Sequence, residues 1–197
     1  MCSSDLPSLG VASLAELIAL ARQQPGLRYA TGSGVGAQHM VVQWFASIAG
    51  IKLDQVPYRG GAPAINDLIA GHVKLGSLGS TPLIPHYQTG ALRLLAQTTE
   101  ARSPSLPDVP TYQEAGMQGL VLDQWVGVFV PAGTPQSIAA RLNVEIGKAL
   151  AEAAAQKSLL DSAQEPIGGT AEQFSQVVRH DFAQYARLVK ELNIKVD

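Results

Sequence analysis

The uneven distribution of charge along the 197-residue chain most restricts the folds open to it. Residues 133–197 contain 15 charged side chains, and the first 132 residues contain only 15. A long segment that is poor in charge and rich in glycine and aliphatic residues is typical of a parallel sheet buried on both faces. The C-terminal third is typical of amphipathic helices with one wet face. The change falls near residues 125–133 and predicts a boundary there.

Composition excludes several classes of protein. The chain is 46% hydrophobic with a net charge of −2, which argues against disorder, a coiled coil or a nucleic-acid-binding surface. Cys2 is the single cysteine, so the sequence offers no disulfide framework and no cysteine metal cluster. No apolar run approaches the roughly 20 residues of a membrane helix. We expect a soluble monomer without a metal or a cofactor.

Strand-like and helix-like segments alternate along the first hundred residues. Glycine-rich connections separate them, and this order indicates βαβ units in an open, mostly parallel α/β sheet with flanking helices. Capping boxes begin at Ser13, Thr111 and Thr170 and predict a helix after each. The predicted strands span residues 27–30, 54–58, 73–78, 92–97 and 120–130.

Beyond residue 133 the pattern predicts helices only. Their apolar stripes, such as Ile138, Leu142 and Ile146, need a surface to cover. The predicted strand 120–130 is too small a surface for two long helices. We infer that part of their docking surface lies outside this chain.

The most informative local feature is the glycine-rich turn of residues 31–36, between a predicted strand and a predicted helix. Glycines allow close backbone approach to a ligand, and free N–H groups at a helix start favour an anion. The turn fails as a dinucleotide fingerprint because His39 stands where a third glycine is required. Asp54 lies at the wrong end of its strand to bind a ribose. A turn that merely shapes the chain remains the alternative.

Two further loops, residues 59–62 and 79–82, are expected at the same carboxyl edge of the sheet. Ligands of open α/β sheets bind outside this edge. Backbone donors and the hydroxyls of Thr31, Ser33, Ser80 and Thr81 suit a carboxylate or a phosphate. The alternative is that glycine and serine are ordinary turn residues.

Catalytic patterns are weak. A nucleophile elbow is absent because Leu75 occupies the place of its first glycine before Ser77. The histidines are scattered, and none has a metal-ligand neighbour at helical spacing. His39 could donate to a ligand, with a packing or capping role as the alternative. We therefore expect a binding protein and no catalytic residues.

A series of ordered motifs resembles one known family. The motifs lie at residues 13–18 (SLAELI), 29–32 (YATG) with His39, 56–64 (VPYRGGAPA), 67–71 (DLIAG), 103–111 (SPSLPDVPT), 114–116 (EAG), 131–135 (PAGTP) and 165–170 (EPIGGT). In this order they resemble the Bug/TctC family, the extracytoplasmic solute-binding proteins of tripartite tricarboxylate transporters. The match runs from about residue 7 to residue 197.

The resemblance implies a type II periplasmic-binding fold with two α/β lobes. It maps residues 7–125 onto the second lobe, and residues 126–197 onto the crossover and helices of the first. The rest of the first lobe and the export signal are absent from this mapping. Residues 1–6 match the translation of a common sequencing adapter, so we expect a non-native scar on a truncated reading frame.

The resemblance also implies a site and partners. The ligand loop falls on Thr31, Gly32, Ser33, Gly34, Val35, Gly36, Ala37, Gln38 and His39, flanked by Tyr58, Gly60, Gly61 and Ser80. Leu78 and Gly79 replace an acidic residue and an asparagine that family members often have. This change favours di- or tricarboxylates over amino acids, unless Asp123 substitutes.

The implied function is periplasmic binding of a small carboxylate, without catalysis, for delivery to membrane permease subunits. Two alternatives stay open. One is an α/β enzyme that binds a nucleotide or phosphate with residues 31–36. The other is an effector-sensing domain.

Overall fold

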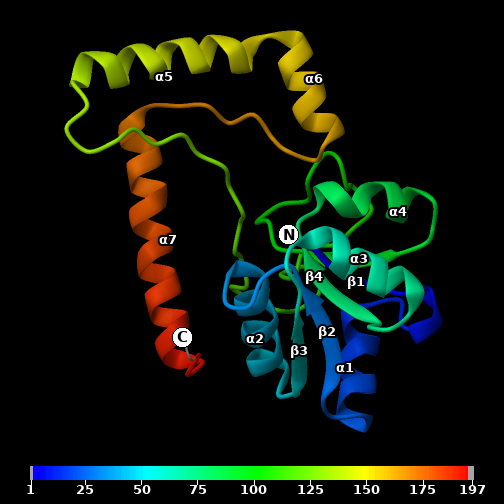
Figure 1. Ribbon diagram of the computed structural model, residues 1–197. Coiled ribbons are helices and arrows are strands. Elements are labelled where there is room, and N and C mark those ends of the chain that lie inside the picture. Colours follow the sequence, from blue (N-terminus) through cyan, green and yellow to red (C-terminus); the bar gives the residue numbers. More distant parts are fainter. Residues whose placement is uncertain (1, 195–197) are drawn as a thin grey trace.

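The computed structural model describes residues 2–194 and forms a five-stranded sheet with helices on both faces (Figure 1). The strands are β1 (Cys2–Asp5), β2 (Leu27–Thr31), β3 (Leu53–Pro57), β4 (Leu75–Leu78) and β5 (Arg93–Gln97). The α-helices are α1 (Leu14–Gln23), α2 (Ala37–Ala49), α3 (Gly61–Ala70), α4 (Ile84–Gln88), α5 (Gln136–Ala151), α6 (Ala153–Asp161) and α7 (Ala171–Glu191). Two 3-10 helices, η1 (Pro7–Leu9) and η2 (Thr81–Leu83), complete the elements.

The strand order is β3-β2-β4-β1-β5, with β2 parallel to both β3 and β4. This arrangement confirms the predicted open α/β sheet. Strand β1 is the exception, because it runs antiparallel between β4 and β5. No element was predicted for residues 1–6, yet residues 2–5 lie inside the sheet. That these residues are non-native remains a prediction.

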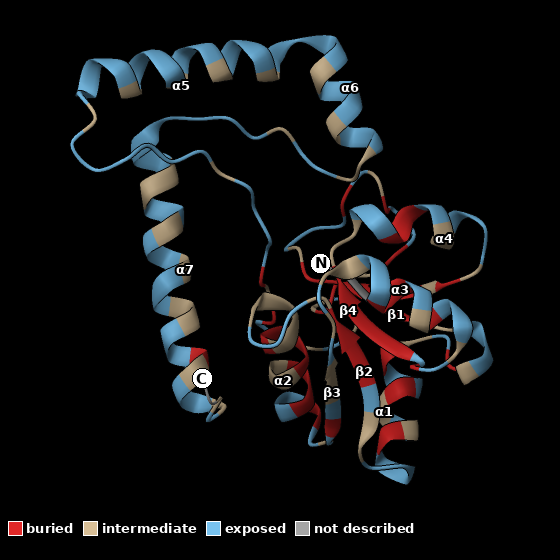
Figure 2. Ribbon diagram, in the orientation of Figure 1, coloured by how far each residue is buried: buried red, intermediate tan, exposed pale blue. Residues whose placement is uncertain are grey.

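Two apolar cores lie on opposite faces of the sheet. One joins α1 and α2 to the sheet, with Tyr29, Phe45 and Tyr112 at its centre. The other lies between the sheet and α3, around Leu68 and Leu83. Figure 2 shows the buried residues concentrated in the sheet and these helices. Both faces of the sheet are covered, as its low charge predicts.

Local signals explain where the helices begin and end. The Ser13 side chain accepts a hydrogen bond from the Glu16 amide, which caps α1. Helices α2 and α3 end at Gly50 and Gly71, and both glycines adopt the left-handed conformation. Thr170 and Gln173 form the predicted capping box of α7.

Two predicted elements are wrong. Residues 120–130 join no strand ladder: the Leu122 amide donates to the Thr98 carbonyl just beyond β5, at 3.1 Å, and the chain then leaves the sheet. The capping box at Thr111 forms both of its hydrogen bonds with Glu114, but it closes a turn and starts no helix. Gly116 follows in the left-handed conformation, at φ +91°, and stops the chain from continuing as a helix.

We call residues 2–125 the lobe and residues 126–194 the arm. The arm leaves the lobe as an extended segment, and α5 and α6 stand away from the sheet (Figure 1). These two helices contain no buried residue, and α7 buries only Leu188, near its contact with α2. The predicted apolar stripes are therefore exposed. Among residues 2–194, no helix combines the length and apolarity needed to cross a bilayer.

Candidate anion-binding site

Three loops meet at the carboxyl ends of β2, β3 and β4. The Tyr58 amide donates to the Thr31 carbonyl at 2.8 Å, and the Gly60 amide donates to the Gly32 carbonyl at 2.9 Å. A Cβ added at Gly61 would lie 3.9 Å from Pro82, so the third loop also borders this edge. The loops predicted at one edge of the sheet are thus brought together.

The structure favours glycine at two of these positions. A Cβ on Gly32 would lie 3.2 Å from backbone atoms of both Gly60 and Gly61, so the two loops would have to move apart slightly to accept a side chain. Gly60 itself has φ +111°, a conformation that other residues avoid. The two loops therefore approach each other as closely as their backbones allow.

The loop after β2 exposes unpaired backbone donors. Thr31 is buried, whereas Ser33, Gly34 and Val35 are exposed. The backbone amides of residues 33–39 donate to no acceptor in the part of the chain that the structure describes, since α2 begins its own bonds at Met40. Gly36, the residue before α2, supplies no side-chain cap. Free donors at a helix start attract an anion.

A chain of hydrogen bonds from β2 and α2 holds His39 in place. Gln43 Nε2 donates to the Tyr29 hydroxyl oxygen at 3.1 Å, and that hydroxyl lies 2.8 Å from His39 Nδ1. The hydroxyl and Nδ1 share one hydrogen, and the tautomer of His39 decides which of the two is the donor. Burial lowers the pKa of His39 and raises the pKa of Tyr29 to about 12. His39 therefore packs on the lobe through Nδ1, and only Nε2 remains for a solute.

Tyr58, another predicted site residue, directs its hydroxyl to its own lobe. The hydroxyl donates to Asp67 Oδ2 at 2.7 Å. Burial, reinforced by this bond, raises the pKa of Tyr58 to about 12, and the same bond lowers the pKa of Asp67. The tyrosine thus anchors the loop after β3 to α3.

The third loop contains Ser80, which is half-buried ahead of η2. Its carbonyl accepts from the amides of Leu83 and Ile84, at 2.9 and 3.2 Å. Gln124 borders the same loop, since its Oε1 would lie 3.8 Å from a Cβ on Gly79. Asp123, the proposed substitute partner for an ammonium group, is exposed next to it in the chain.

Two glutamines hold the loop of residues 31–34 in place. Gln38 Oε1 accepts from the Gly32 amide at 2.7 Å. Gln55 Nε2, on β3, lies 2.8 Å from Thr31 Oγ1, 3.1 Å from the Ser33 carbonyl and 2.5 Å from the Gly34 carbonyl. Gln55 was not among the predicted site residues. Its only signal in the sequence is a polar side chain at the second position of the predicted strand 54–58.

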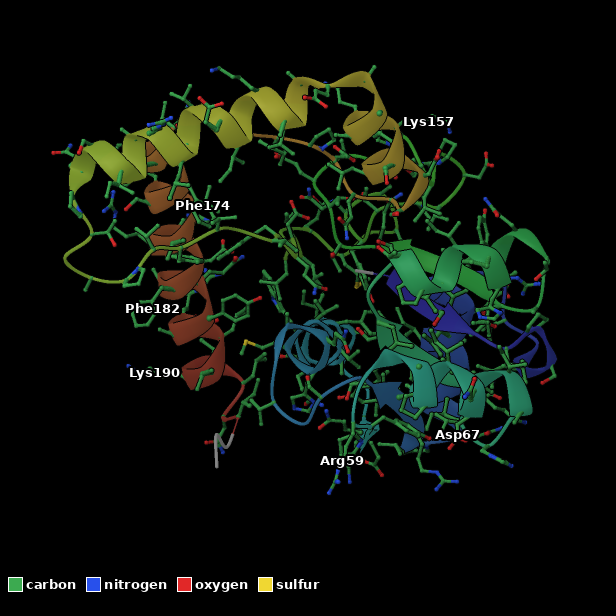
Figure 3. The ribbon with its side chains drawn as sticks, turned by 45° about the horizontal axis from the view of Figure 1, so that its top comes forward. Arg59, Asp67, Lys157, Phe174, Phe182 and Lys190 are labelled. Atoms are coloured by element: carbon green, nitrogen blue, oxygen red, sulfur yellow. The ribbon has the colours of Figure 1, made fainter. Side chains whose placement is uncertain are left out.

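Arg59, between Tyr58 and Gly60, is the charged donor closest in sequence to this edge, and it is exposed (Figure 3). The backbone donors of residues 33–39 are uncharged. No cluster of three or more His, Cys, Asp and Glu side chains suited to a metal ion occurs within residues 2–194. The geometry suits an anion small enough to be held by main-chain N–H groups.

Known proteins resemble this chain along almost its whole length. An uncharacterised protein encoded between tcbD and tcbE in Pseudomonas sp. strain P51 is 33% identical over 93% of this chain and 55% of its own length. BugT of Bordetella pertussis is 30% identical over 96% of this chain and 59% of its own length. The chain thus spans little more than half the length of these relatives.

A solved structure of Rpa4515 from R. palustris, with adipate, superimposes with a TM-score of 0.91 at 32% identity. The superposition covers 98% of this chain and 65% of that one. The chain therefore has the fold of periplasmic binding proteins. The family model described as "Tripartite tricarboxylate transporter family receptor" (TctC) matches residues 4–194. The chain belongs to this TctC receptor family.

Proposed function

We propose that this chain supplies most of one lobe of a periplasmic receptor that binds a small carboxylate. The observation on which this proposal rests is the row of unpaired amides over residues 33–39, at the start of α2. Such donors stabilise a carboxylate without a cationic side chain. The receptor delivers its solute to permease subunits and catalyses no reaction.

The class of solute is a di- or tricarboxylate. The R. palustris relative was solved with adipate, a dicarboxylate. Residues 31–36 contribute no charged side chain, so one carboxylate group is held by neutral donors. The loops around Gly60, Gly61 and Ser80 lie close enough to contact the rest of the solute.

The arm belongs to the other lobe of the receptor. The exposed apolar residues of the helices support this assignment, for example Ile138 at 51% and Phe182 at 76%. In this arrangement the solute lies between two lobes, so the present chain alone binds it weakly. The receptor works as a monomer.

The test is a titration of the ¹⁵N-labelled chain with adipate, succinate, malate and citrate, followed by NMR. We expect the amide signals of residues 33–39 to shift with each carboxylate that binds. ATP and inorganic phosphate serve as competing ligands. Binding of ATP alone, or carboxylate shifts confined to the arm, contradicts the proposal.

A matched pair of variants locates the site. Gly36→Leu places a side chain where Ser33 Oγ lies only 3.0 Å from the added Cβ, beside the exposed amides. Gly147→Leu, on α5, adds the same side chain in open space. We expect Gly36→Leu to abolish the adipate shifts while Gly147→Leu leaves them unchanged. Equal binding by both variants contradicts the assignment.

A further inference from the structure

The carbonyl groups of residues 31–34 all point toward the lobe. The Thr31 carbonyl accepts from the Tyr58 amide, and the Gly32 carbonyl accepts from the Gly60 amide. The Ser33 carbonyl accepts from two side chains, Thr31 Oγ1 at 2.7 Å and Gln55 Nε2 at 3.1 Å. For the Gly34 carbonyl, Gln55 Nε2 at 2.5 Å is the only partner within residues 2–194.

A planar trans peptide fixes what these bonds do to the amides. The C=O of one residue and the N–H of the next point in opposite directions across the peptide plane. A Ser33 carbonyl turned toward Gln55 therefore turns the Gly34 N–H away from it. A Gly34 carbonyl held by Gln55 likewise turns the Val35 N–H outward.

Packing does not hold this part of the loop. Ser33, Gly34 and Val35 are exposed, and a Cβ added at Gly34 would meet nothing within 4 Å. Only the hydrogen bonds to its carbonyls hold the peptide planes against rotation. A rotated plane would present a carbonyl oxygen to an anion where a donor is needed, which is repulsive.

We propose that Gln55 is the positioning residue of the solute loop: its amide group holds the carbonyls of Ser33 and Gly34 and so aims the N–H groups of Gly34 and Val35 at the solute. The proposal rests on the proposed carboxylate function for its consequence in binding. The predicted direction of the two peptide planes does not depend on whether a solute binds. Gln55 acts through the backbone and does not itself touch the solute.

Four variants test the proposal. Gln55→Met keeps the length of the side chain but removes both donors, and Gln55→Glu replaces them with a carboxylate that repels the three oxygens. Gln55→Lys restores donors on a side chain that is one bond longer, since an ammonium group has three. Gln23→Met, at the exposed end of α1, is the matched control.

The first readout needs no solute. The ¹³C′ chemical shift of a carbonyl reports the hydrogen bond that it accepts. We expect Gln55→Met to change the ¹³C′ shift of Gly34 and to broaden or move the Val35 amide signal, with the melting temperature close to that of the control. Thr31→Val removes one of the two donors to Ser33 and should change the Ser33 shift while sparing Gly34. Unchanged Ser33 and Gly34 shifts in Gln55→Met overturn the proposal.

The second readout is adipate binding. We expect Gln55→Met and Gln55→Glu to bind about tenfold more weakly or worse, and Gln55→Lys to bind within a few-fold of the original chain. Binding by Gln55→Met equal to that of Gln23→Met overturns the proposal. If the original chain binds none of the carboxylates, the proposed function fails, and the ¹³C′ shifts still decide whether Gln55 orients the loop.

Discussion

The lobe and the arm contain equally regular helices but differ in what those helices bury. Among the described residues, every one that is buried lies at or before position 122, apart from Leu188. The arm has a complete capping box at Thr170 and a helix of 21 residues behind it. Local signals are thus sufficient to specify a helix, whereas burial requires an opposing apolar surface.

One contact between the two regions is aromatic and only half-buried. Trp125 packs edge-on against Phe174, with ring centroids 5.0 Å apart, and its Nε1 donates to Asp181 at 2.6 Å. Figure 3 shows Phe174 and Phe182 on α7, the helix that stands apart from the sheet. Burying one such ring stabilises a protein by about 1.5–3 kcal/mol. The aromatic rings of the arm that remain exposed do not contribute this stabilisation.

The comparison predicts a large difference in amide hydrogen exchange. Strands β2 and β4 open only when the lobe unfolds, whereas α5 has no tertiary contact that buries a residue. We expect amides of β2 and β4 to be protected at least ~10³-fold more than those of α5, because isolated helices of this length are marginal in water. Exchange measured residue by residue by NMR checks this. Equal protection in α5 and β4 would break the comparison.

Two substitutions on α7 test the same comparison between buried and exposed residues. Leu188 is fully buried against the lobe, and Phe182, on the same helix, is 76% exposed. We expect Leu188→Ala to lower the free energy of unfolding by about 2–5 kcal/mol, and Phe182→Ala to change it by less than about 0.5 kcal/mol. Urea unfolding measures both. A larger cost for Phe182→Ala would mean that α7 packs by a different face.

The smallest expected effect concerns the lobe alone and depends on pH. Asp5 in β1 is buried, and neither carboxylate oxygen has a hydrogen-bond partner among residues 2–194. Burial raises its pKa from 3.8 to about 6, against the opposing charge of Arg93. The folded state therefore binds this proton more tightly than the unfolded state, and stability falls as the pH rises from about 4 to about 6. The loss is about 3 kcal/mol at most.

Asp5→Asn tests this dependence. His39 titrates with the opposite sign, because burial lowers its pKa and stability is lost as the pH falls through its range. The original chain and Asp5→Asn both contain His39. Subtracting their free energies of unfolding at each pH, measured with urea, therefore cancels the contribution of His39. We expect Asp5→Asn to gain stability relative to the original chain above pH 6 and not at pH 4. A difference that is independent of pH would contradict the buried carboxylate.

Much of the lobe could be predicted from local patterns. The capping at Ser13 and the glycines at positions 50 and 71 mark helix ends through short-range chemistry, and the structure confirms them. Residues 120–130 are as apolar as a strand, but only Leu122 bonds the chain beside β5 before the segment leaves the sheet. Strand formation depends on a partner elsewhere in the chain, which a local pattern does not report.

In the candidate site, too, some features are local to one turn and others depend on the folded lobe. The glycines and hydroxyls of residues 31–36 are visible in the sequence because they are local to one turn. Gln55 is 21 residues from Gly34, and its role follows from the parallel pairing of β2 and β3. The anchoring of Tyr58 by Asp67 and of His39 by Tyr29 also requires the folded lobe.

The antiparallel direction of β1 decides at which edge of the sheet its N-terminal end lies. Because β1 runs against its neighbours, Cys2 pairs with Leu78 and Gln97, at the edge where the loops after β2, β3 and β4 meet. The first residues thus pair with partners more than seventy positions later in the chain, which are contacts of long sequence separation. Any peptide fused ahead of Cys2 would emerge beside the loops that we propose bind the solute. A purification handle is better placed at the carboxyl terminus.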